Sequence, residues 1–274
     1  MPPMGEVVYS QDATIAVIRD YYDFLTKLYL HVEEIIQPPE EGWPSITPES
    51  LKSLGKTENV VSLLQHLPYI REHDECGNKA DGTPWTYFAD WQHEAQMLAH
   101  DSTFAERPII VFELSPPIDV PSHVISLTIG GRNRWRFLLD TELGVIYWIG
   151  CPEELKHDSR HKKVKNEAKE LDWRAGAGIW AITEFFDLLK DQYIKLNFWP
   201  YDSQYVYDIW GHHKDGVASL VRDIYSDHEW PDLTQYRKEE CLEALGAALE
   251  EHFPLQYGLR DEGDPLNHWG MNSV

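Results

Sequence analysis

The sequence predicts an α+β fold, a small and mostly antiparallel sheet covered by helices, with a helical elaboration at the N-terminal end. Three observations lead to this fold class: a strand meander over 123–150, an amphipathic helix pattern directly after it, and a first helix near the N-terminus. A chain of 274 residues can bury a core without disulfide or metal staples. We expect a single domain over 1–274, with a weak internal boundary at 71–83.

The meander is predicted from alternation and from turns that contain glycine. Apolar residues alternate through 135–140, and β-branched and aromatic residues resume at 145–149. The polar connection between them contains Gly144, which can adopt positive φ. A glycine pair joins a further strand candidate, 123–129, to this hairpin. We therefore expect 124–128, 135–140 and 145–149 to be consecutive antiparallel strands.

A helix is predicted after the meander. Thr183 is a suitable N-cap, and Pro200 is expected to end the helix because proline lacks the N–H group. Phe198 and Trp199 are expected to fold back on the same core. The apolar stripe of this helix comprises Phe185, Phe186, Leu189, Tyr193 and Leu196.

The first helix is predicted from apolar residues that step by three and four between Ile18 and Ile35. Asp12 is the expected cap, and the helix is expected to stop before Pro38. A second helix is expected over 57–67.

The remaining segments are assigned from composition. The polar, glycine-containing stretch 71–83 is expected to be a surface loop. The locally basic run 156–169 is interleaved with glutamates and is expected to be a solvated loop or exposed helix. Two later helices are expected, around 217–225 and 233–252.

Charge restricts the classes of partner. The chain has 24 Lys and Arg against 46 Asp and Glu, a formal net charge of −22. Long-range repulsion disfavours nucleic acid and anionic membrane surfaces. We expect no nucleic-acid and no membrane partner; a basic protein is the expected partner, and a small molecule is the alternative.

Cysteine usage and hydropathy indicate a cytoplasmic protein. The three cysteines are far apart in the sequence, and an odd number without a secretion signal fits a reducing compartment. The apolar runs are shorter than the roughly twenty residues that span a bilayer. The best metal-ligand pair, His157 and His161, lacks a third ligand, so we expect no metal and no cofactor.

Aromatic residues mixed with polar ones mark a candidate ligand or partner surface. Large flat side chains beside hydrogen-bonding groups are typical of pockets and interfaces, although core packing gives the same pattern. Further tryptophans flank the helix after the meander and could form a second surface of this kind. The candidate residues are Trp85, Tyr87, Asp90, Trp91, His93, Trp173 and Trp180.

The hairpin and the helix after it resemble the SUKH superfamily, which includes a yeast regulator of cell-wall synthesis and many bacterial immunity proteins. The resemblance lies in FLLDTELGVIYW, a variable polar loop and ITEFFDLLK, within 135–189, and it depends on packing and turn residues. The nearest match to the Leu-Pro-x-x-Tyr-Lys segment of the family is poor and lies at 66–70. The matching residues are Asp140, Gly144, Val145, Tyr147, Thr183, Phe185, Phe186 and Leu189.

Two functional hypotheses follow. The SUKH resemblance implies a non-enzymatic intracellular interaction or regulatory protein. The whole chain is also similar to fungal proteins of unassigned function, particularly over 230–245, and the alternative is a small cofactor-independent enzyme or accessory protein of a fungal secondary-metabolic pathway. Convergent titratable groups in one apolar pocket would favour the enzyme, whereas an acidic surface with an exposed tryptophan would favour the binding protein.

Overall fold

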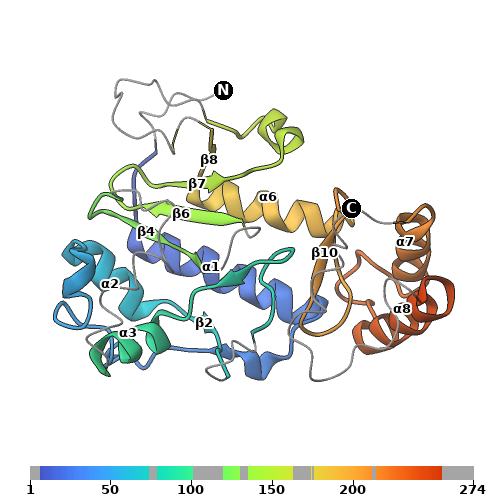
Figure 1. Cartoon of the computed structure of the whole chain (residues 1–274), viewed down its shortest axis with the longest axis horizontal. Helices are drawn as coiled ribbons and strands as arrows, with labels where there is room; N and C mark the ends of the chain where they lie inside the picture. Colours follow the sequence, from blue (N-terminus) through green and yellow to red (C-terminus); the bar gives the residue numbers. More distant parts are fainter. Residues whose placement is uncertain are drawn as a thin grey trace, which may run out of the picture.

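The computed structural model describes residues 7–73, 79–100, 120–129, 135–162, 174, 176–211 and 214–254. It confirms the α+β fold with small antiparallel sheets. Two helices, α1 (Gln11–Leu28) and α6 (Ile182–Ile194), pack against each other, and the largest sheet lies against them (Figure 1). Whether the chain forms a single domain with a weak boundary at 71–83 stays a prediction.

The central sheet has the order β4-β6-β7-β8, and each neighbouring pair is antiparallel. The predicted meander is therefore confirmed, and β8 extends it. Phe137 lies opposite Trp148 in the β6–β7 hairpin. The strands are β4 (Val124–Ser126), β6 (Arg136–Asp140), β7 (Val145–Ile149) and β8 (Gly178–Ala181).

The first strand of the meander is interrupted. After Ser126 the chain bends, and β5 (Thr128–Ile129) pairs with β3 (Tyr87–Phe88) in a separate two-stranded sheet. The Ser126 hydroxyl donates to the Thr128 carbonyl at 2.6 Å. This local bond accompanies the bend, because a side chain that bonds nearby backbone competes with regular strand pairing.

The helix after the sheet differs from its prediction at both ends. Strand β8 runs directly into α6, so Ala181 occupies the N-cap position and Thr183 lies inside the first turn. The helix ends at Ile194, before Leu196 adopts a left-handed φ of 53°. Pro200 does not end the helix; it lies in β9 (Phe198–Pro200), which pairs with β10 (Val206–Asp208). Phe198 and Trp199 do pack into the core, as predicted.

The first helix is shorter than predicted and has another cap. Ser10 caps α1 by accepting the Ala13 amide at 3.3 Å, and Asp12 lies in the first turn. The helix ends at Leu28, well before Pro38. The apolar spacing continues into η2 (Val32–Glu34) and β1 (Ile35–Ile36), which pairs with β2 (Tyr69–Ile70).

The other helices lie at opposite ends of the molecule. In Figure 1, α2 and α3 lie at one end of α1, and α7 and α8 lie at the other, beyond β10. The prediction for α2 is confirmed, with Thr57 as its cap. These helices and the remaining short turns are η3 (Lys52–Leu54), α2 (Glu58–His66), α3 (Trp91–His100), η5 (Glu153–His157), α7 (Val217–Asp227) and α8 (Lys238–His252).

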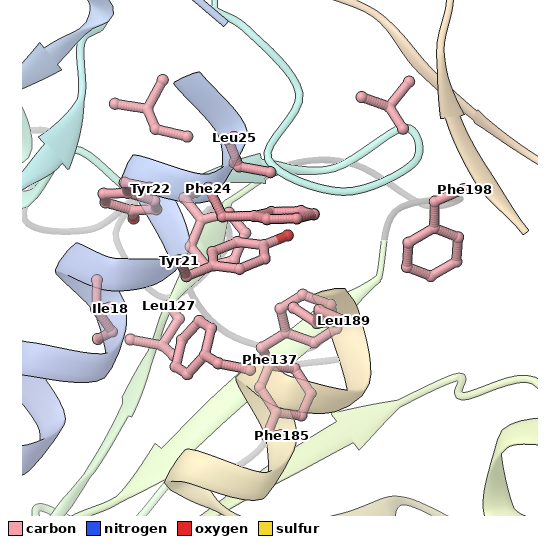
Figure 2. Packing of buried hydrophobic residues seen from close by; sticks show 14 of the residues in the cluster. Ile18, Tyr21, Tyr22, Phe24, Leu25, Leu127, Phe137, Phe185, Leu189 and Phe198 are labelled. Atoms are coloured by element: carbon pink, nitrogen blue, oxygen red, sulfur yellow. The ribbon is translucent and has the colours of Figure 1, made fainter. Parts of the chain in front are cut away.

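The core is rich in aromatic residues and lies between the helices and the sheet. Figure 2 shows Tyr21 of α1, Phe137 of β6 and Phe185 of α6 converging there. The Phe137 and Phe185 rings meet at 4.9 Å between centroids and 72°. Edge-to-face ring pairs of this kind add to the stability that apolar burial provides.

Two of the predicted loops are more firmly packed than expected. Residues 79–83 are buried, so the prediction of a surface loop over 71–83 is wrong for this part. In the basic run, Arg160 contacts Asp191 at 2.8 Å, and buried Lys162 contacts Glu184 at 2.8 Å. Carboxylates on α6 thus bind Arg160 and Lys162 of this run. Residues 163–169 lie outside the described residues. Within the described ranges, every helix is too short or too polar to cross a bilayer.

Candidate functional site

The structure separates the residues of the predicted candidate surface. Trp91 and Trp180 are core residues, and the Trp91 indole N–H donates to the Ser126 carbonyl at 3.0 Å. For these two tryptophans, core packing is the correct interpretation, because their neighbours are buried apolar side chains. Trp173 lies outside the described residues.

The polar members of the candidate surface have local structural roles. Asp90 is buried and accepts the His93 amide at 3.1 Å, as an N-cap side chain does at the start of α3. Tyr87 is half-buried on β3, where it lies opposite Ile129. Of the predicted residues that the structure describes, Trp85 is the most exposed, at 36%.

Trp85 lies at the tip of a strained turn. The Thr86 amide donates to the Thr83 carbonyl at 3.0 Å, with Pro84 and Trp85 between them. Trp85 has a φ of 57°, a value that glycine or asparagine usually supplies at the third position of such a turn. A bulky side chain at positive φ costs roughly 1–2 kcal/mol. Backbone strain at an exposed aromatic residue is a reason to suspect function.

Aromatic residues of the β9–β10 hairpin support Trp85. Its ring meets Tyr207 at 4.4 Å between centroids and 82°, and Tyr207 stacks on Trp199 at 4.9 Å. Tyr201, which is half-buried, meets Tyr207 at 5.9 Å. Tyr205 is also half-buried, and its carbonyl accepts the Tyr201 amide at 2.8 Å. We call Trp85, Tyr201 and Tyr205 the Trp85 surface; Tyr207 and Trp199 lie beneath it.

The segment that leads to Trp85 is held by buried tyrosine hydroxyls. Tyr21 and Tyr193 donate to the Gly82 carbonyl at 2.6 and 3.2 Å, and Tyr29 donates to the Asp81 carbonyl. Burial raises the pKa of all three tyrosines well above the ordinary value, so they remain donors. Each of these bonds gives a buried backbone carbonyl a hydrogen-bond donor, which backbone polar groups need in the interior.

A second link joins the same segment to the β9–β10 hairpin. The Val206 amide donates to the Asp81 carboxylate at 3.1 Å, and the Asp81 amide donates to the Gln204 carbonyl at 2.7 Å. The segment that leads to Trp85 is therefore fixed both to the core and to the hairpin whose Tyr207 contacts the Trp85 ring.

A buried ionic cluster lies at the other end of the segment. The Lys79 ammonium group contacts the Glu72 carboxylate directly and lies 3.9 Å from Glu94 Oε1. Burial raises the pKa of Glu94 to about 7, with the Glu72 and Asp90 carboxylates adding to the effect. Burial also raises the pKa of Asp90, although it accepts backbone amides.

The four groups of this cluster do not line the small pocket that lies beside α3. A small pocket beside α3 is lined mostly by apolar side chains, such as Trp91, Ile125 and Leu138. Asp90 and Glu94 are not among its lining residues. Among the described residues, no three His, Cys, Asp or Glu side chains gather as a metal site requires. His161 instead packs its ring against Trp180, at 5.1 Å between centroids.

Comparison with known proteins provides no relative from which a site could be transferred. No family model, no curated protein and no solved structure matches this chain. The functional argument therefore depends on the geometry of the Trp85 surface and of the buried cluster.

Sequence reasoning missed most of both features. The tyrosines at 201, 205 and 207 form a pattern that is visible in YDSQYVYD, and Pro84 before Trp85 marks a turn. These signals could have connected Trp85 with the hairpin. No local sequence pattern indicates that Glu72, Lys79 and Glu94 form a cluster, because only the tertiary fold brings these residues together.

Proposed function

We propose that this chain is a non-enzymatic binding protein that engages a basic protein partner through the Trp85 surface. The observation that carries the proposal is the exposed Trp85 side chain on a turn whose backbone is strained. Tryptophan and tyrosine are enriched among the residues that dominate binding energy at interfaces. The buried Tyr207 and Trp199 rings hold the surface rigid before binding, which lowers the entropic cost of association.

The charge of the neighbouring helices supports a basic partner. Helix α7 is tied to the hairpin by the Tyr225 hydroxyl, which donates to the Pro200 carbonyl at 2.9 Å. Exposed carboxylates on α7, α8 and their connections outnumber the exposed basic side chains, which are Lys214, Arg222 and Arg237. The resulting field attracts cationic surfaces. The exposed carboxylates are Asp215, Asp223, Asp227, Glu229, Asp232, Glu239, Glu240, Glu243, Glu250 and Glu251.

The two hypotheses from the sequence differ in how well the geometry supports them. An exposed tryptophan beside an acidic surface is the feature expected of a binding protein. The enzyme hypothesis requires titratable groups in an apolar pocket, and the buried carboxylates Asp90 and Glu94 are not among the residues that line the pocket beside α3. The SUKH resemblance and the cytoplasmic location stay predictions, and the proposal agrees with both.

The proposal is tested by binding measurements with matched variants. The partner is first isolated on immobilised wild-type chain and identified by mass spectrometry, and the purified partner is then measured by surface plasmon resonance. Trp85→Ala should weaken binding by about 30-fold, the loss expected for an interface residue worth about 2 kcal/mol. Val8→Ala, which truncates an exposed apolar residue outside this acidic surface, should leave the affinity unchanged.

Salt provides an independent check. Raising the sodium chloride concentration should slow association more than it accelerates dissociation, because exposed charges are screened beyond about 8 Å at physiological ionic strength. Equal affinity of the wild type and Trp85→Ala, or a strongly acidic principal partner, would contradict the proposal.

A further inference from the structure

Three carboxylates and one ammonium group meet in the interior. Glu72 follows β2, Asp90 precedes α3, Glu94 lies in the first turn of α3, and Lys79 begins the 79–83 segment. The side chains of Lys79, Glu94 and Glu72 are 2, 8 and 12% exposed, and Asp90 is buried. The four groups thus connect α3 to the segment that leads to Trp85.

The charges in this cluster do not balance when all four groups are ionised. One lysine neutralises one carboxylate, and burying the remaining negative charges in a low-dielectric interior is costly. A carboxyl group that keeps its proton removes part of that cost. Proton binding is therefore part of how the cluster is stabilised.

The three carboxyl groups differ in how well their contacts compensate a negative charge. Asp90 accepts the amides of His93 and Glu72, at 3.1 and 3.3 Å, and these bonds favour its charged form. Glu72 contacts Lys79 directly, whereas Glu94 lies 3.9 Å from the ammonium nitrogen. Of the three carboxyl groups, Glu94 therefore has the weakest compensation for a negative charge.

Among the described residues, the groups that face the cluster from α1 and β2 are tyrosines, which carry no positive charge. In the described part of the chain, α1 contributes Tyr22 and β2 contributes Tyr69. Both tyrosines are buried, and burial raises their pKa above the ordinary value. His93, in the first turn of α3, is half-buried, and its charge lowers the pKa of Asp90, whereas the pKa of Glu94 is shifted by burial, Lys79, Glu72 and Asp90.

We propose that Glu72, Lys79, Asp90 and Glu94 form a proton-controlled latch, which holds the 79–83 segment firmly against α3 when Glu94 is protonated and loosens when Glu94 ionises. The latch does not depend on the proposed partner binding, because it operates in the free chain. Local opening would hydrate the ionised carboxylate and relieve its repulsion from Glu72 and Asp90.

The direction of the pH dependence follows from linkage. Glu94 has a pKa of about 7 in the closed state, against an ordinary value of 4.5 once it is exposed to water. Between these values the closed state holds a proton that the open state has lost. Opening should therefore become easier as the pH rises from 5 to 7, by up to about tenfold per pH unit, and should level off above pH 7.

Hydrogen exchange of the free chain tests the latch. Amides of 79–83 and of the first turn of α3 are followed from pH 5 to 8 and corrected for intrinsic exchange. In the wild type, the corrected exchange of these amides should become faster as the pH rises toward 7, because the segment opens more often. Glu94→Gln keeps the shape of the side chain but replaces the carboxyl group with an amide that does not ionise. Opening of the 79–83 segment should therefore become independent of pH in this variant. Glu243→Gln, on the exposed face of α8, should retain the wild-type profile.

A second measurement covers the case in which Glu94→Gln does not fold. The side-chain carboxyl carbon of Glu94 is titrated by NMR in the wild-type chain, where a midpoint between pH 6 and 8 is expected. An ordinary midpoint near 4.5, or exchange that is equally pH-independent in the wild type, would overturn the latch.

Discussion

The two ends of the 79–85 segment are held in place by different kinds of interaction. At Lys79 the chain is anchored by buried charges, and at Trp85 it presents an aromatic ring to solvent. A single proton changes the charge of the buried cluster, whereas the Trp85 ring is held by packing on the Tyr207 ring. The Lys79 end of the segment can therefore change its interactions with pH, whereas the Trp85 end is held by ring packing.

Whether the two ends act independently depends on what lies between them. Asp81 and Gly82 are held by the hydroxyls of Tyr21, Tyr29 and Tyr193. We refer to these two residues and three tyrosines as the tyrosine clamp. If the tyrosine clamp holds firmly, local opening at Lys79 should leave the Trp85 turn unchanged. If the clamp is weakened, the opening should extend to Trp85.

Gly82→Ala should break the clamp. A Cβ atom at this position would lie 2.2 Å from Phe88 Cδ2. The Phe88 ring cannot easily move, because it packs on Tyr21 and Phe137 at 5.9 and 6.0 Å between centroids. We expect a loss of roughly 3 kcal/mol in the free energy of unfolding, at the upper end for an overpacked core. Urea denaturation measures this loss.

Gly246→Ala is the matched control. Gly246 lies inside α8, and a Cβ atom there would meet nothing within 4 Å. Alanine should stabilise the protein by about 1 kcal/mol, because glycine is unfavourable in a helix interior. Equal stability changes for the two substitutions would mean that Gly82 is not tightly enclosed.

Removing single hydroxyls should weaken the clamp without breaking it. Tyr29→Phe removes the tyrosine donor to the Asp81 carbonyl and should cost about 1 kcal/mol, the net contribution of a typical hydrogen bond. Tyr193→Phe should cost less, because the Gly82 carbonyl keeps the Tyr21 hydroxyl. Thermal and urea unfolding compare the two variants, and a larger loss for Tyr193→Phe would refute the assignment of these bonds.

The parts of the fold that could be predicted from sequence have local causes. The β6–β7 hairpin follows from alternation around Gly144, which has a φ of 66°, and α2 follows from its Thr57 cap. Helix α1 was extended too far in the prediction, because the three- and four-residue spacing continues beyond Leu28 to Val32, which is exposed in the short turn η2, and to Ile35, which is half-buried on β1.

The interior position of 79–83 could not be predicted for a different reason. Its residues are lysine, alanine, aspartate, glycine and threonine, which usually indicate a surface loop. They can be buried because tyrosines from α1 and α6, distant in sequence, donate to their carbonyls. The candidate site was found only in part, since Trp85 was among the seven candidates and its hairpin neighbours were not.

The smallest expected effect distinguishes strain at Trp85 from ordinary packing. Trp85→Gly and Trp85→Ala both remove the ring and its contact with Tyr207, so their difference reports the backbone alone. At a φ of 57° glycine is unstrained and alanine is not, so Trp85→Gly should be more stable by about 1 kcal/mol. The same pair at Val32, exposed in a short helical turn without positive φ, should favour alanine. If alanine is also preferred at position 85, the turn is unstrained, and the argument that function maintains a tryptophan there loses its physical basis.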